Sequence, residues 1–287
     1  MRGSHSKTSF NHARYASCRP IYPPSLYATV LAYHAGPRAH CLDLGTGHGL
    51  VARALSPHFA RVTATDPSEG MLAQAQAATD AATDALPNIT FRAASAEALP
   101  FLADGSVDLV VAGQAAHWFD YPRLWPGLAR VVRPGGSLAF WGYRDATLPG
   151  HVAASRLITK YAYGEDKMGP YWSRPGRGIV EDNYRAIVPA AEAGWRDVQR
   201  LEYWPDDMAM GDGKGTMFLQ KSMTLHALAE YIRTWSAYHG WQEAHKSADV
   251  DVVDELVDEM MDAEGWASRD VELCVEWGSG LVMARRQ

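Results

Sequence analysis

The sequence is poor in the features that mark secreted, metal-binding and membrane proteins. Its 287 residues include only three cysteines, which are Cys18, Cys41 and Cys274. Their odd number and wide spacing argue against a disulfide framework and against a zinc site. No apolar run approaches the roughly 20 residues that a membrane-spanning helix needs. Together these absences favour a reducing environment, and we expect a cytoplasmic protein.

An excess of positive charge and paired histidines are also missing. The 27 lysines and arginines are outnumbered by 33 aspartates and glutamates, so the net charge is -6. Such a chain is a poor candidate for nonspecific nucleic-acid binding. Its 11 histidines include no His-x-x-x-His or His-Glu pair of the kind that binds metal. We therefore expect no metal, no nucleic acid and no membrane among its partners.

Three glycines at alternate positions form the most informative stretch of the chain. An apolar run ends in Asp43, then Gly45, Thr46 and Gly47 follow, and a helical pattern begins after Gly49. This order predicts a strand, a tight glycine turn and a helix. Glycines let the backbone approach a ligand closely, and a helix N-terminus offers unpaired N–H groups. The stretch therefore indicates a loop for a nucleotide-type cofactor.

The spacing of these glycines narrows the choice of cofactor. A dinucleotide loop has the pattern Gly-x-Gly-x-x-Gly, but here Gly49 comes one position early and Leu50 follows it. A phosphate-binding P-loop would end in Gly-Lys-Ser or Gly-Lys-Thr, which is absent from the stretch. The pattern instead resembles the first motif of class I S-adenosylmethionine-dependent methyltransferases. In that family the loop surrounds the methionine end of the cofactor.

An acid at the end of the next predicted strand fits the same cofactor. Residues 61–65 form a short β-branched run that ends in Asp66, about twenty residues after the glycine loop. An acid in this position accepts hydrogen bonds from both ribose hydroxyls, whereas a lone Asp66 could simply cap the following helix. With the glycine loop upstream, ribose binding is favoured, and the resemblance adds Pro67 and Met71 to the cofactor site.

Two further strand ends complete the predicted cofactor site. Residues 89–92 and 106–112 are predicted strands, and ligands bind beyond the carboxyl ends of such strands in an open α/β sheet. In the family that the loop resembles, residues after the third strand meet the adenine, and residues after the fourth face the methyl group. The resemblance therefore implies cofactor contacts from Ser95, Ala96, Glu97, Gln114, Ala115 and His117. Glu97 has a second interpretation, as a charge near a helix N-terminus.

An N-terminal arm precedes this core. Two proline clusters break helix formation before the helical pattern of residues 26–33, so the arm is expected to run over the domain. It serves either for packing alone or as a lid over the cofactor. In the small-molecule methyltransferases that the chain resembles, a Tyr…Arg-Pro-x-Tyr-Pro segment closes the pocket, which here implies cofactor contacts from Tyr15 and Arg19.

The alternation of strands and helices predicts an α/β fold. We expect a Rossmann-like, mostly parallel seven-stranded sheet with helices on both faces, an antiparallel last strand, and a helical, aromatic insert as a substrate cap. Two helices are predicted near the C-terminal end, over 225–235 and 253–260. Residues 1–7 are expected to be a tag or a disordered start, and residues 8–36 an arm and helix over the cofactor site. Residues 37–145 are expected to form the cofactor-binding core, and residues 146–196 an acceptor-binding insert. Residues 197–287 are expected to form the end of the sheet with inserted helices.

The wider chain resembles a narrower group of methyltransferases. The matching segments are Arg19-Pro20-x-Tyr22-Pro23, residues 116–120, residues 169–172 with 175–177, and residues 231–236. They resemble the fungal trans-aconitate methyltransferase-like group, which methylates small acids and anhydride-derived carboxylates. The resemblance implies transfer of a methyl group from S-adenosylmethionine to a carboxylate oxygen of a small, trans-aconitate-like acid.

The chemistry of the acceptor decides which side chains the reaction needs. A carboxylate is already ionised at pH 7 and requires no base, but it requires cationic groups to hold it. Arginines and aromatic residues of the insert and its surroundings are the candidates: Arg144, Arg174, Arg177, Arg233, Trp118, Tyr171, Trp172 and Trp235. A phenol or thiol would need a base, and His117 is then the candidate catalytic residue. If no base is needed, His117 forms a wall of the pocket. Trp118 either lines the pocket or is an ordinary core residue.

Other functions remain open from the sequence. One is O- or S-methylation of a phenolic or thiol secondary metabolite, with His117 as the base. Another is a protein of the same fold that binds the cofactor without methylating anything, because a fold and a cofactor site do not fix the chemistry. A nicotinamide oxidoreductase is a third, although the glycine spacing counts against it.

Overall fold

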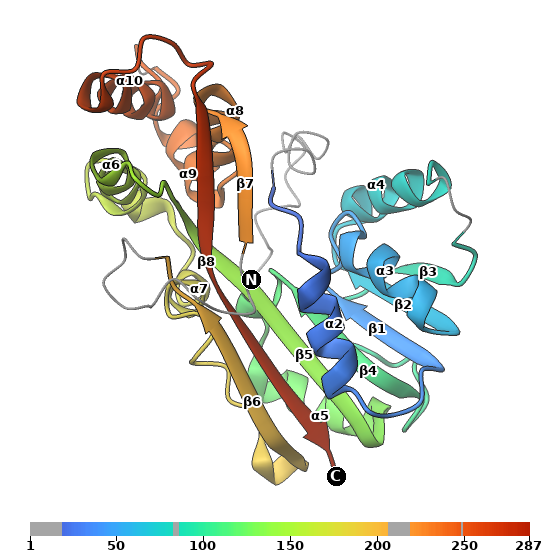
Figure 1. Cartoon of the computed structure of the whole chain (residues 1–287). Coiled ribbons are helices and arrows are strands. Elements are labelled where there is room, and N and C mark those ends of the chain that lie inside the picture. The colour runs from blue at the N-terminus through green and yellow to red at the C-terminus, as the bar shows by residue number, and fades with distance from the viewer. Residues whose placement is uncertain (1–18, 83–85, 206–218, 248) are drawn as a thin grey trace.

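The computed structural model describes residues 19–82, 86–205, 219–247 and 249–287. Within these residues the chain forms one eight-stranded sheet in the order β3-β2-β1-β4-β5-β8-β6, and β7 also pairs with β8 (Figure 1). The first five strands pair in parallel, whereas β8 is antiparallel to β5, β6 and β7. The strands are β1 (His40–Leu44), β2 (Arg61–Asp66), β3 (Ile89–Ala93), β4 (Val107–Gly113), β5 (Val132–Thr147), β6 (Trp195–Tyr203), β7 (Leu219–Thr224) and β8 (Glu272–Arg286). The predicted Rossmann-like fold is confirmed.

Helices cover both faces of the parallel strands. In chain order, the α-helices of the described residues are α2 (Pro24–Tyr33), α3 (Leu50–Leu55), α4 (Glu69–Asp80), α5 (Tyr121–Val131), α6 (Val152–Tyr163), α7 (Gly176–Glu181), α8 (Leu225–Ile232), α9 (Ser236–Ala244) and α10 (Val252–Glu264). Leu109 and Val111 of β4 belong to the hydrophobic cluster that includes α2 and α3, and Val110 and Ala112 belong to the cluster that includes α5. The central strands are therefore buried on both sides, which explains why they are apolar runs and not alternating patterns.

The register of the parallel strands brings the predicted cofactor residues to one edge. Leu44, the last residue of β1, pairs with Thr65, so Asp66 lies just past the point where the glycine loop begins. Asp43 pairs with Val111 of the neighbouring β4. The loops after β1, β2 and β4 consequently lie side by side at the carboxyl edge of the sheet.

Two long strands connect this parallel core to a helical cap. β5 continues to Thr147, which pairs with Glu276 of β8, and the far end of β8 pairs with β7. Figure 1 shows β5 and β8 crossing the molecule, with α6, α8, α9 and α10 gathered around their far end. One hydrophobic cluster runs from α2 and β1 to α10. The cap and the core therefore share both a sheet and a hydrophobic interior.

The strand count corrects one prediction. The sequence predicts seven strands, and the additional one within the described residues is β7. Only Leu219 and Met223 of this edge strand are buried, at 2% and 6% exposure, and polar residues separate them. Such a short alternation carries too little signal to be recognised, and pairing with β8 stabilises the strand instead.

The helix count corrects a second prediction. The periodicity of residues 225–235 predicts one helix, but α8 ends at Ile232 and α9 begins at Ser236. Trp235 between them has an extended backbone, with φ of -71° and ψ of 143°. Thr224 caps α8, because its hydroxyl accepts a hydrogen bond from the Ala227 N–H at 3.1 Å.

Candidate active site

The glycine loop has the backbone conformation that glycine permits. The φ angles of Gly45, Gly47 and Gly49 are 65°, 55° and 79°. A Cβ on Gly45 would lie 2.5 Å from the Cβ of Ala115, whereas a Cβ on Gly47 would meet nothing within 4 Å. Gly45 thus allows the loops after β1 and β4 to pack together, and Gly47 leaves open space at the same edge.

Asp43 lies buried beneath this loop. Its Oδ2 accepts a hydrogen bond from the Thr46 hydroxyl at 2.6 Å, and its buried Oδ1 has no partner among the described residues. Burial raises the pKa of Asp43 to about 7, and the nearby charge of Asp66 acts in the same direction. A buried acceptor without a partner is costly, so a ligand that donates a hydrogen bond here would relieve it.

Asp66 connects the glycine loop to the start of α4. One carboxylate oxygen accepts from the Gly47 N–H at 2.9 Å, and the other accepts from the Ser68 N–H at 2.8 Å. The residue that caps α4 is Ser68, whose hydroxyl accepts from the Met71 N–H at 3.3 Å. Because each carboxylate oxygen has two lone pairs, Asp66 keeps acceptor capacity for further hydroxyl groups.

A pocket lies beyond the end of β4 and beside the outer part of β5, between the core and the cap. Eight of the predicted site residues line it: Arg19, Gln114, His117, Trp118, Arg144, Trp172, Arg177 and Trp235. They come from the arm, from the loop after β4, from β5, from α7 and the segment before it, and from the segment between α8 and α9. The fold thus brings together residues up to 216 positions apart, since Arg19 and Trp235 share one pocket.

Gln114 fixes the end of β4 against β5. It has a φ of 55°, its side-chain N–H donates to the Tyr143 carbonyl at 3.0 Å, and its side-chain oxygen accepts from the Tyr143 N–H at 2.7 Å. Arg19 contacts the same residue from the arm, because it donates to the Tyr143 hydroxyl at 3.1 Å and to the Thr234 carbonyl at 3.2 Å. Arg19 therefore connects β5 to the cap.

The charge of Arg19 also affects a histidine within the glycine loop. Burial, with the charges of Arg53 and Arg19, lowers the pKa of His48 to about 4. His48 lies within the loop, between Gly47 and Gly49. The charge of Arg19 therefore reaches the glycine loop.

His117 has a fixed orientation in the pocket. Its Nδ1 lies 3.0 Å from the hydroxyl of Tyr184, which is buried, and its ring packs against Trp118 with centroids 4.9 Å apart. A Cβ on Gly142 would lie 2.2 Å from the Tyr184 hydroxyl, so the absence of a side chain at Gly142 gives Tyr184 its place. The ring is therefore held by neighbours from three separate segments.

The pocket arginines differ in what neutralises them. Arg177 forms a buried ion pair with Asp145 of β5 and stacks over Trp172 at 3.9 Å. Arg144 stacks over Trp204 at 4.5 Å, but it forms no ion pair or hydrogen bond with any described residue, and its Nε is buried. Burial lowers the pKa of Arg144, and the Asp145 charge opposes this. An arginine remains cationic under these conditions, so Arg144 presents a positive charge to the pocket without a direct ion pair.

Comparisons with known proteins establish the family. A family model described as a methyltransferase domain matches residues 42–140. CRG1 of Saccharomyces cerevisiae, named a probable S-adenosylmethionine-dependent methyltransferase, is 28% identical over 99% of this chain and 98% of its own length. An uncharacterized methyltransferase of Schizosaccharomyces pombe is 31% identical over 66% of this chain and 74% of its own. The chain belongs to the class I S-adenosylmethionine-dependent methyltransferases. Its enzymatic class and its cofactor follow from this membership.

A solved structure agrees with this assignment. It is a protein from Anaeromyxobacter dehalogenans described as a type II methyltransferase, with a TM-score of 0.69 and 28% identity over 93% of this chain and 97% of that one. The methyltransferase's own residues fit S-adenosylmethionine. The space over Gly47 admits a ligand, the buried Oδ1 of Asp43 lacks a donor, and Arg19 lies near the loop.

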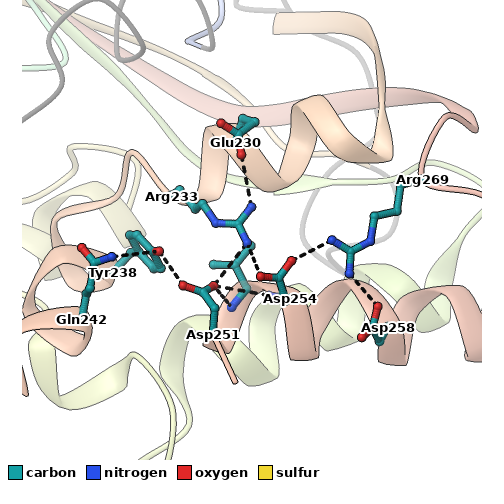
Figure 2. A network of polar contacts seen from close by, with 9 residues as sticks. Glu230, Arg233, Tyr238, Gln242, Asp251, Asp254, Asp258 and Arg269 are labelled. Carbon is teal, nitrogen blue, oxygen red and sulfur yellow. Dashed lines mark hydrogen bonds and ion pairs between the residues drawn. The ribbon is translucent and has the colours of Figure 1, made fainter. Parts of the chain in front are cut away.

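Three predicted acceptor residues of the methyltransferase lie outside the pocket lining. Arg233 connects α8 to α10 through Glu230 at 3.2 Å, Asp251 at 3.3 Å and Asp254 at 2.8 Å (Figure 2). Three carboxylates surround its guanidinium, so Arg233 joins α8 to α10, and the structure does not bring it to the pocket lining. Arg174 is 56% exposed and pairs with Glu181 at 3.0 Å, and Tyr171 packs against α9 at Gly240.

Most of the remaining predicted cofactor residues follow β2 or β3, and Met71 lies in the first turn of α4. Glu97, after β3, accepts a hydrogen bond from the Asp120 N–H at 2.9 Å and so tethers the start of α5. Ala96 and Met71 are buried, at 7% and 1% exposure, and Ser95 is half-buried. Pro67 is exposed just after Asp66. Tyr15 lies outside the described residues.

The pocket also contains residues that the sequence did not indicate, namely Tyr143, Asp145, Ser173, Val180, Tyr231 and Ser236. Tyr143 and Asp145 come from the outer part of β5, beyond Gly142. They are buried in the folded chain, where burial continues to Thr147, and the sequence alone carries no comparable signal. In the described ranges no group of three or more His, Cys, Asp or Glu side chains could hold a metal ion. No helix there is long and apolar enough to cross a bilayer.

Proposed function

We propose that this methyltransferase methylates a carboxylate oxygen of a small organic acid, with trans-aconitate-like acids as the first compounds to test. One observation carries the proposal: Arg144 lines the pocket half-buried, its Nε is buried, and no carboxylate among the described residues forms an ion pair with it. A half-buried cation without a direct ion pair favours an anionic ligand. A planar guanidinium also matches a carboxylate through two parallel hydrogen bonds.

The residues at the carboxyl edge of the sheet would hold the cofactor, which supplies a methyl group on a positively charged sulfur. In the proposal the loop of Gly45, Thr46 and Gly47 surrounds the methionine end, with Asp43 accepting from its amino group and Arg19 facing its carboxylate. Asp66 accepts from the ribose hydroxyls, helped by Pro67 and Met71. The adenine and the donor methyl are approached by Ser95, Ala96, Glu97, Gln114, Ala115 and His117.

The pocket's contribution to catalysis is positioning and exclusion of water. A carboxylate needs no base at pH 7, so Arg144 only orients it, and a free carboxylate oxygen faces the methyl carbon. With the cofactor bound, that oxygen would accept the methyl group, and the electron pair of the broken carbon–sulfur bond would stay on sulfur. Walls formed by Trp172 and Trp235 keep solvent away from the reacting atoms.

The first test is transfer of labelled methyl to a panel of small acids, phenols and thiols, with each product exposed to mild base. A base-labile product from an acid is the expected result, because carboxyl methyl esters hydrolyse readily. A stable product from a phenol or thiol, with no acid accepted, would contradict the proposal.

The matching variant is Arg144→Gln. A hydrogen bond to a charged group contributes roughly 1.5–3 kcal/mol, so kcat/KM for the acid should fall roughly 10- to 150-fold. Cofactor affinity, measured by calorimetry, should stay unchanged. Arg174→Gln is the control, because Arg174 is exposed, pairs with Glu181 and does not line the pocket. Equal activity of both variants would remove Arg144 from acceptor binding.

A second candidate function is methylation of a phenol or thiol with His117 as base. It is favoured by one contact, the 3.0 Å approach of His117 Nδ1 to the Tyr184 hydroxyl, which orients the ring in the pocket. His117→Gln would then abolish turnover while cofactor affinity persists, and the pH profile would change. Near-normal turnover by this variant would leave His117 as a wall of the pocket.

A further inference from the structure

We infer that the acceptor carries a single carboxylate on a flat, apolar body such as an aromatic ring, and that Trp118 contacts this body. The inference rests on the proposed function, because it specifies which acids the pocket accepts. The inference distinguishes acceptors with one carboxylate on an apolar body from small acids with several carboxylates.

The charges of the pocket leave one cation available to bind an anionic acceptor. Arg177 is neutralised by Asp145, with side-chain exposures of 11% and 9% for the two partners. Arg19 hydrogen-bonds to Tyr143 and Thr234 and acts on the glycine loop, where the cofactor's own carboxylate belongs. Arg144 then remains for the acceptor. A second or third carboxylate would have to be buried near Asp145 without a cation, which is strongly unfavourable.

Aromatic rings lie beside the polar residues of the described pocket lining. Trp172 and Trp235 lie 5.6 Å apart between centroids at 44°, and Tyr231 meets Trp235 edge to face at 5.9 Å. Val180 adds an aliphatic surface to the same lining. These rings suit an apolar or aromatic body next to the charged end of the pocket.

Trp118 is the conspicuous member of this lining. It is 41% exposed, although its neighbours Ala115 and Ala116 are buried. Its ring is supported by His117 and faces the pocket that holds Arg144. A large aromatic side chain exposed beside a charged anchor provides a stacking surface for a ligand, and the acceptor's flat body is its natural occupant.

The experiment compares three acids of graded chemistry as acceptors. Cinnamate has one carboxylate and a ring, crotonate has one carboxylate without a ring, and trans-aconitate has three carboxylates. We expect kcat/KM for cinnamate to exceed that for trans-aconitate at least tenfold, with crotonate between them. A preference for trans-aconitate would overturn the inference and leave carboxylate methylation standing. Methylation of phenols or thiols but of no acid would overturn both.

Variants of two tryptophans separate stacking from general damage. Aromatic pairs contribute about 0.5–1.5 kcal/mol, so Trp118→Leu should lower kcat/KM for cinnamate roughly 2- to 13-fold and leave that for crotonate unchanged. Trp266→Leu is the matched control, because Trp266 packs against His151 outside the pocket lining. An equal loss for cinnamate and crotonate, or an equal loss in the control, would contradict a contact between Trp118 and the ring.

Discussion

Gly47 shows what one residue contributes to the cofactor loop. Its backbone lies in the left-handed region, and a Cβ there would project into open space at the carboxyl edge of the sheet. Gly150 offers a matched case, because its φ of 81° is also left-handed and a Cβ there would also meet nothing within 4 Å. Gly150 lies between β5 and α6, away from the glycine loop.

Alanine at these two positions should therefore separate strain from ligand contact. Each substitution places an L residue at positive φ and should cost roughly 1–2 kcal/mol of stability. Gly47→Ala should in addition weaken S-adenosylmethionine binding about tenfold or more, because its Cβ occupies the ligand's space. Calorimetric titration measures the affinity, and urea unfolding measures the stability. Unchanged cofactor affinity in Gly47→Ala would show that the ligand avoids this part of the loop.

Asp43 should make the stability of the cofactor-free protein depend on pH. Its folded pKa of about 7 lies above the unfolded value of about 3.9, so the folded state holds the proton more tightly. The contribution of Asp43 to stability is full below about pH 4 and is lost as the pH rises towards 7. Relative to the wild type, the free energy of unfolding of Asp43→Asn should rise by up to about 4 kcal/mol between pH 4 and 8. Urea unfolding at several pH values measures this gap, and a constant gap would disprove the raised pKa.

At the level of elements, one buried ion pair holds three of them together. Arg177 belongs to α7 and Asp145 to β5, and the hydroxyl of Tyr163, at the end of α6, bonds to both. Arg177 also makes a longer contact with Glu181, one turn further along α7, at 3.4 Å. This cluster, formed by Arg177, Asp145 and Tyr163, fixes the short α7 over the pocket.

Breaking the cluster from one side should cost more than removing both charges. Arg177→Gln leaves Asp145 buried without its cation, and the expected loss in the free energy of unfolding is about 3–5 kcal/mol. The double variant with Asp145→Asn removes both charges and should lose less than the two single variants together. Chemical denaturation of the four proteins measures the coupling. Additive losses would show that the two charges do not stabilise each other.

The same elements explain how much of the fold and of the site could be predicted from the sequence. The glycine loop and Asp66 are local signals at strand ends, so the sequence was enough to place them. The arginines of the pocket could not be ranked from the sequence, because their partners come from distant segments: Asp145 for Arg177, and Asp251 with Asp254 for Arg233. β7 was missed for the same physical reason, since its stability comes from pairing with β8.

At the level of the whole molecule, the cap and the core are one structural unit. β8 pairs with β5 in the core and with β7 beneath the cap helices. The largest hydrophobic cluster extends through both parts without interruption. A hinge between cap and core would have to break the ladder of β8.

Calorimetric unfolding should therefore show a single transition. The van't Hoff and calorimetric enthalpies should agree, as expected for a cooperative unit. Saturating S-adenosylmethionine should raise the temperature of that whole transition, because it binds only the folded state. Two resolved peaks, with only one of them shifted by the cofactor, would show that the cap and the core unfold separately.

The position of β8 along the chain also governs how the protein can fold during its synthesis. β8 is the last of the described strands to leave the ribosome, yet β6 and β7 pair with no other strand. The nascent chain must therefore carry these two strands, and one open edge of β5, until β8 arrives. Unpaired strand edges promote association between chains, and distant pairings form slowly. We expect the antiparallel half of the sheet to assemble only after β8 has been synthesised, and to be the part most dependent on chaperones.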